Sequence, residues 1–268
     1  MSQDLIINIT SQQDMSSWDV GKKILEKIFS VPKLIPEKIA TFGEVTARNG
    51  FSISDIGQCE PYWAAKATMR ISGAPVDILQ DFSWKRSKVA KSKATVTFPT
   101  KNMKQDQILG GIFFQSEFRK DINWLDIFTT WCDASSAFAG MLHPFSGDDI
   151  KTTKRSNLLE MSLDEEIAEK ARARFRNGIF HTEFRAGDLN SKVSGLTDLG
   201  WANWFGGYLA KEVNADAISA AGFIIKKFGN SYMIQLTDNI DDAANDHELL
   251  SHRRAKLKGL FKKNLFLI

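Results

Sequence analysis

The stretch Lys93-Ala94-Thr95-Val96-Thr97-Phe98 decides the fold class, because it alternates polar and apolar residues and is rich in β-branched side chains. This pattern, which ends the segment Val89–Phe98, is typical of a half-buried β-strand. Further strand-like segments surround it at Thr68–Ser72, Val76–Trp84 and Ile108–Phe118. The connections between these segments are too short for crossover helices, which predicts an antiparallel sheet.

Regular spacing of apolar residues predicts helices that follow the sheet segments. From Trp124 to Leu142, apolar residues recur every three or four positions, which places them on one face of a helix that Pro144 ends. A second, aromatic helix is expected at Leu199–Val213, with Trp201 and Trp204 in its apolar side.

The two ends of the chain carry further predicted elements. Leu5–Thr10 is apolar and β-branched, which favours a strand. Phe223–Lys227 and Tyr232–Thr237 are expected to form a hairpin around the turn Gly229-Asn230. A final helix is predicted from a cap at Asn245 to Phe261.

These elements together predict an α+β fold, in which an antiparallel β-sheet is covered by helices and a second, helix-rich half carries a β-hairpin. Residues 1–268 are expected to form a single domain, with two subdomains as an open alternative: a sheet-rich half, 1–150, and a helix-rich half with the hairpin, 151–268. The polar segment 151–159 is the candidate linker, and a capped, charged helix is expected from Ser162 to Gly178.

The composition indicates a soluble, cytoplasmic protein. Of the 268 residues, 43% are hydrophobic and 25% are charged, as in ordinary globular chains. No apolar run approaches the ~18 residues that a membrane helix needs. The N-terminus lacks the features of a signal peptide, and the two cysteines, Cys59 and Cys132, favour a reducing compartment.

No complete catalytic, cofactor or metal motif is present in the sequence. His247 and His252 lie five residues apart, so that their rings point ~140° apart on a helix instead of toward one zinc ion. His181 and Glu183 match half of a zinc-deaminase motif without its Cys-x-x-Cys half. We therefore expect a protein that is not an enzyme, with no catalytic residue, cofactor, metal or small-molecule substrate.

Basic residues concentrate between Trp84 and Lys104, where no acid occurs. The seven are Lys85, Arg86, Lys88, Lys91, Lys93, Lys101 and Lys104. Lysines on the solvent face of a sheet are the favoured interpretation. Nucleic-acid binding by the basic strands 84–104, together with the basic C-terminal helix from Arg253 to Lys258, is the open alternative.

Acidic residues concentrate in a second segment, which contains no base. The five candidate partner-binding residues are Asp238, Asp241, Asp242, Asp246 and Glu248. They are consistent with a solvated loop that leads into a helix, or with an acidic patch that docks on a basic protein such as a nuclease.

Several motifs together resemble the bacterial immunity protein 52 family. They are Phe82–Arg86, Trp124 with Trp131, Leu142–Phe145, Ala186–Asn190, Leu199–Gly206, the strand ending Leu236-Thr237 and the final helix with Arg253, Arg254 and Phe261. The resemblance implies a cytoplasmic inhibitor, without cofactor or catalysis, of a cognate toxin delivered between bacteria. The implied toxin is a type VI secretion effector with nuclease (DNase) activity, which would be inhibited by occlusion of its active site or by a block to its assembly. The formal net charge of +3 differs from the acidic character usual in nuclease inhibitors.

Overall fold

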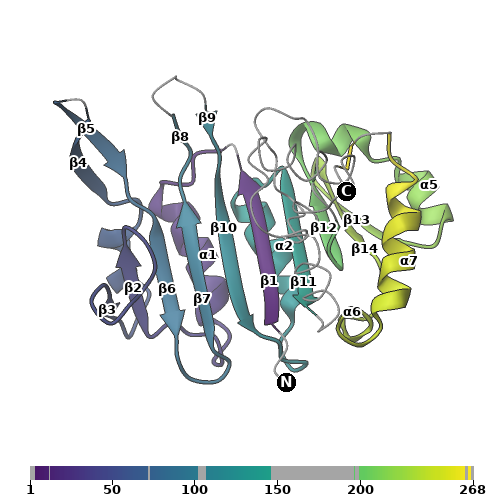
Figure 1. Ribbon diagram of the computed structural model, residues 1–268, viewed down its shortest axis with the longest axis horizontal. Helices are drawn as coiled ribbons and strands as arrows, with labels where there is room; N and C mark the ends of the chain where they lie inside the picture. The colour runs from purple at the N-terminus through teal and green to yellow at the C-terminus, as the bar shows by residue number, and fades with distance from the viewer. Residues whose placement is uncertain are drawn as a thin grey trace, which may run out of the picture. The chain divides into compact units, whose positions relative to one another are not determined.

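The computed structural model (Figure 1) describes residues 4–11, 13–71, 73–101, 107–145, 196, 199–262 and 265–266. The chain divides into two compact units, unit 1 (Met1–Asn8 with Phe138–Ile268) and unit 2 (Ile9–Ala137). Strand β1 (Asp4–Ser11) crosses the division. Each unit is described by itself.

Unit 2 contains an antiparallel arrangement of strands in the order β10-β7-β6-β2-β3. These strands are β2 (Lys38–Thr41), β3 (Phe51–Ser52), β6 (Phe82–Arg86), β7 (Ser92–Thr97) and β10 (Gly110–Glu117). Two small two-stranded sheets accompany them, namely β4 (Lys66–Ile71) with β5 (Ala74–Leu79), and β8 (Thr100–Lys101) with β9 (Gln107–Ile108). The helices of this unit are α1 (Trp18–Phe29), the 3-10 helix η1 (Gly57–Tyr62) and α2 (Trp124–Ala134).

Helices α1 and α2 lie on the same face of these strands (Figure 1). The ring of Trp131 in α2 packs against Trp84 of β6 and Phe114 of β10, with centroid separations of 5.9 Å and 5.3 Å. Its indole N–H donates a hydrogen bond of 2.9 Å to the carbonyl of Ile24 in α1. The side chain of Ser17 accepts from the backbone N–H of Val20 and so caps the start of α1.

Unit 1 contains a second antiparallel set in the order β11-β12-β14-β13. The strands are β11 (Ala139–Phe145), β12 (Ala202–Phe205), β13 (Ile224–Phe228) and β14 (Ser231–Gln235). The helices are the 3-10 helix η2 (Gly207–Glu212), α5 (Ala215–Ala220), α6 (Ile240–Asn245) and α7 (His247–Lys258). Helix α6 contacts β11 and α7, while α5 contacts β13.

The predicted α+β class with antiparallel strands and helices is confirmed, including the hairpin around Gly229-Asn230. The predicted helix Trp124–Leu142 is too long, because α2 ends at Ala134 and Ser136 takes a left-handed φ of 47°. The last four residues of the predicted helix, Ala139–Leu142, belong to β11, whose seven residues are all buried. An entirely buried strand has no alternation, so its sequence pattern does not separate it from a buried helix.

The predicted aromatic helix Leu199–Val213 is also wrong. Its first part is β12, which pairs with both β11 and β14 and buries all four of its residues, and only its second part forms the short helix η2. The final helix begins at His247 with Asp246 as its cap, since Asn245 ends the separate helix α6.

Several features of the sequence lie outside the described residues, namely the linker at 151–159, the helix from Ser162 to Gly178, the half-motif at His181 and Glu183, and the resemblance motif Ala186–Asn190. In the part of the chain that is described, no helix is long and apolar enough to cross a membrane.

Candidate functional site: two charged surfaces

The predicted acidic residues lie close together in sequence, on the segment between β14 and the first turn of α7. Asp238 is exposed in the loop after β14, while Asp241 and Asp242 lie in the first turn of α6. Asp246 caps α7, since its carboxylate accepts a hydrogen bond of 2.9 Å from the backbone N–H of Leu249. Glu248 lies in the first turn of α7.

Four of these five carboxylates therefore occupy helix N-termini, where negative charge is favourable against the helix dipole. Only Asp238 has no role at a helix end. Asp246 and Glu248 are nevertheless exposed, so they remain accessible to a partner beside Asp238.

In the basic segment of unit 2, several charges are compensated within the chain. Ion pairs join Lys88 to Glu37 (3.5 Å), Lys91 to Glu117 (3.8 Å) and Lys93 to Glu44 (3.1 Å). The guanidinium of Arg86 donates to the backbone carbonyl of Ile35 at 2.9 Å, and it also donates to the carbonyl of Val89. Lys104 lies outside the described residues. A nucleic-acid surface needs uncompensated charge along a backbone track, which this pairing reduces.

Glu37, the ion-pair partner of Lys88, has a lowered pKa. The backbone N–H of Ser87 donates to Glu37 at 2.9 Å, and this hydrogen bond is the main reason that the pKa of Glu37 is lowered. The nearby charge of Lys88 lowers this pKa further. Glu37 therefore stays ionised beside Lys88 over a wider range of pH.

The register of the strands reveals a cross-strand row that the sequence does not show. Lys38 of β2 pairs with Lys85 of β6, and Lys85 pairs with Lys93 of β7. Directly paired residues project from the same face of a sheet. We call these three residues the lysine row. Lys85 and Lys93 are in the predicted basic segment, whereas Lys38 is distant in sequence and only strand pairing brings it to the others.

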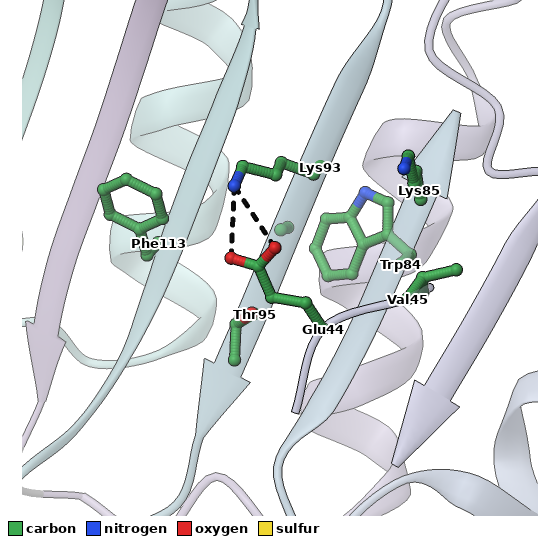
Figure 2. Close-up of a pocket in the computed structure, with 8 residues that line it drawn as sticks. Glu44, Val45, Trp84, Lys85, Lys93, Thr95 and Phe113 are labelled. Carbon is green, nitrogen blue, oxygen red and sulfur yellow. Dashed lines mark hydrogen bonds and ion pairs between the residues drawn. The ribbon is translucent and has the colours of Figure 1, made fainter. Parts of the chain in front are cut away.

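A small hollow of about 30 Å³ adjoins the lysine row (Figure 2). The residues that line it are Glu44, Val45, Trp84, Lys85, Lys93, Ala94, Thr95 and Phe113. A volume of this order accommodates water molecules, whereas small-molecule sites measure roughly 300–1,000 Å³. The hollow is therefore a feature of a surface and not a substrate pocket.

Glu44 is held over Lys93 by an ordered loop. The side-chain amide of Asn49 donates to the backbone carbonyls of Thr41, Phe42 and Glu44, at 3.3–3.4 Å. The carboxylate of Glu44 accepts from the Lys93 ammonium through both oxygens, at 3.1 Å and 3.3 Å (Figure 2). A carboxylate from the chain itself thus occupies one end of the lysine row.

The basic C-terminal helix has structural contacts within unit 1. In α7, the guanidinium of Arg253 donates to the carbonyls of Leu236 (2.7 Å) and Gly222 (2.6 Å) and lies over the ring of Phe223. The ammonium of Lys256 donates to the carbonyl of Ala221 at 2.9 Å. These two bases attach α7 to the segments that flank β13 and β14, so they are not free to bind phosphate.

Cysteines and metal-binding side chains were the remaining candidates for chemistry. Both Cys59 and Cys132 are buried free thiols. Burial raises the pKa of Cys59 to about 12, and burial also raises the pKa of Cys132. Neither thiol is activated as a nucleophile. Among the residues whose placement is described, no group of three or more His, Cys, Asp or Glu is arranged to hold a metal ion.

The most distinctive resemblance motif, Leu199–Gly206, has structural roles. The Asn203 amide donates to the carbonyl of Gly200 at 3.0 Å and accepts from its N–H at 2.7 Å. The indole N–H of Trp201 donates to the Thr237 hydroxyl at 3.0 Å. These residues shape β12 and its entry, and all of them are buried.

The strands and helices define an α+β protein built on antiparallel sheets. Its fold is similar to that of a solved structure from Pseudomonas aeruginosa, described as the T6SS protein PA0821. The match has a TM-score of 0.51 and 11% sequence identity, and it covers 94% of this chain and 72% of the other. At this identity the likeness concerns the fold alone.

Comparisons of the sequence itself give no match, either to a protein-family model or to a curated protein. Membership of the immunity protein 52 family therefore stays a prediction.

Proposed function

We propose that this protein is an immunity protein, which binds a cognate antibacterial effector of a type VI secretion system and neutralises it in the cell that produces it. The observation that carries the proposal is the fold shared with a T6SS protein over 94% of the chain. The resemblance of its sequence motifs to immunity proteins points to the same secretion system from different evidence.

The effector that the sequence resemblance implies is a nuclease. A nuclease holds phosphate and so presents a basic surface, which the acidic segment would contact mainly through the exposed carboxylates of Asp238, Asp246 and Glu248. Neutralisation then follows from occupation of the phosphate-binding surface or from a block to effector assembly. It requires no catalytic residue and no cofactor in this chain.

The test is a tagged pull-down from the native bacterium, washed at low and high salt, with the bound species identified by mass spectrometry. We expect one stoichiometric protein partner that is retained at high salt and is toxic when expressed alone. Recovery of nucleic acid that is lost at high salt, with no protein partner, would contradict the proposal, since such binding depends steeply on salt.

A further inference from the structure

The lysine row is an arrangement that folding stability does not explain. Like charges directly opposite one another on neighbouring strands are destabilising. Lys38 and Lys85 are both exposed and have no ion-pair partner among the described residues, and Glu44 is paired only with Lys93. Within the part of the chain that the structure describes, at least two adjacent positive charges on this sheet face therefore have no compensating carboxylate.

Within the part of unit 2 that the structure describes, this face is the one that helices α1 and α2 leave open. Trp84 and Phe114 contact Trp131 of α2, and their neighbours along each strand must project to the opposite side. Lys85 and Phe113 are such neighbours, and Phe113 exposes 42% of its surface beside Thr95, its partner in register. The open face thus combines a basic row with an exposed aromatic ring.

The contact between Glu44 and Lys93 indicates which chemical groups the lysine row can bind. The Glu44 carboxylate accepts from the Lys93 ammonium through both of its oxygens, while Lys85 on the neighbouring strand has no such partner among the residues whose placement is described (Figure 2). A row of lysines with one carboxylate already in place is complementary to further carboxylates.

We propose that the lysine row binds an acidic α-helix of a partner protein, laid across strands β2, β6 and β7. Neighbouring strands lie ~4.8 Å apart, and helix residues three or four apart have Cβ atoms ~5–6 Å apart. One face of a helix with repeated Glu or Asp therefore matches successive lysines, and Phe113 contacts its apolar side. The inference does not require that the chain neutralise a toxin, so its test is separate from that of the proposed function.

A helix is favoured over nucleic acid by the carboxylates that border the row. Glu37, Glu44 and Glu117 all lie beside the basic residues of this unit, in ion pairs with Lys88, Lys93 and Lys91. A phosphate backbone needs a long basic track, and these ion pairs shorten the track that the chain offers. A short helix needs only the row itself.

The experiment measures binding of the full chain to labelled peptides by fluorescence anisotropy. The probe is an alanine-rich helix of about 20 residues with glutamates on one face, long enough to be helical in isolation. The comparison peptide has the same composition, with the glutamates distributed around the helix. We expect tighter binding of the one-faced peptide. We also expect its affinity to fall by roughly fivefold or more in K38Q/K85Q.

The matched control is K226Q/K227Q, which removes the same charge from exposed positions of β13. This control should leave the affinity within about twofold of wild type. E44Q should increase the affinity, since it releases Lys93. Equal loss in both double variants, no preference between the peptides, or tighter binding of single-stranded DNA that K38Q/K85Q abolishes would each overturn the proposal. Circular dichroism checks that each variant is folded.

Discussion

The indole N–H of Trp131 donates a hydrogen bond of 2.9 Å to the carbonyl of Ile24. The buried ring of Trp84 contacts Trp131, but its own indole N–H has no acceptor among the described residues. The first bond joins α2 to α1. Replacing Trp131→Phe removes a buried donor and leaves a smaller ring. We expect the free energy of unfolding to fall by about 2–4 kcal/mol.

The matched substitution is Trp84→Phe, which removes a buried donor that has no acceptor. The ring becomes smaller as before, but no hydrogen bond is lost, so the decrease should be smaller by about 1 kcal/mol or more. Urea denaturation followed by fluorescence compares the two variants. Equal destabilisation would show that the bond between Trp131 and Ile24 contributes nothing.

The lysine row predicts a substitution that stabilises the fold. Lys85→Thr removes repulsion from Lys38 and Lys93 and introduces a β-branched residue that favours a strand. The free energy of unfolding should rise by roughly 0.2–1 kcal/mol. Lys226→Thr is the control, because Lys226 pairs with Met233 and meets no like charge across its strand. A lower midpoint for Lys85→Thr than for the control would contradict the account.

The two buried thiols predict a pH dependence. Because the pKa of Cys59 in the folded chain is raised to about 12, above the ~8.5 of a free thiol, burial favours its protonated form. Its contribution to stability is fully present below pH ~8.5 and is lost as pH rises toward 12. At pH 8, Cys59 and Cys132 should react with Ellman's reagent only after denaturation. Rapid reaction in the native protein would show that a thiol is accessible.

Two substitutions in the acidic segment distinguish a role in helix capping from a role in partner binding. Asp246→Ala removes the bond to the N–H of Leu249 and should lower the free energy of unfolding by about 0.5–2 kcal/mol. Asp238→Lys, away from any helix end, should leave stability within about 0.5 kcal/mol of wild type. It should nevertheless weaken effector binding roughly fivefold, as measured by calorimetry. Unchanged affinity would remove the acidic segment from the interface without affecting the account of the fold.

The sequence predicted those elements whose residue pattern identifies their secondary structure. Polar and apolar residues alternate in β7, one face of which is buried, and the turn residues Gly229-Asn230 indicated the hairpin of β13 and β14. The pattern failed in β11 and β12, which are buried throughout, so that Leu142 and Trp204 fit a helical spacing by chance.

The candidate surfaces were predicted to the extent that they are local in sequence. The acidic segment is continuous along the chain and is found by composition alone. The lysine row needs the pairing of β2 with β6, which places Lys38 beside Lys85, and no local pattern contains that information. The ion pairs to Glu37, Glu44 and Glu117 likewise depend on tertiary structure. The sequence of the basic segment alone therefore suggests more unpaired positive charge than the structure has.

Neutralisation of an effector by binding to this chain can be tested in growing cells. The most direct measurement is the growth of cells that express the partner recovered by pull-down, with and without this chain. The account predicts that the partner alone arrests growth and that co-expression restores it, in proportion to the complex formed. Arrest that persists when the two proteins form a stoichiometric complex would contradict it.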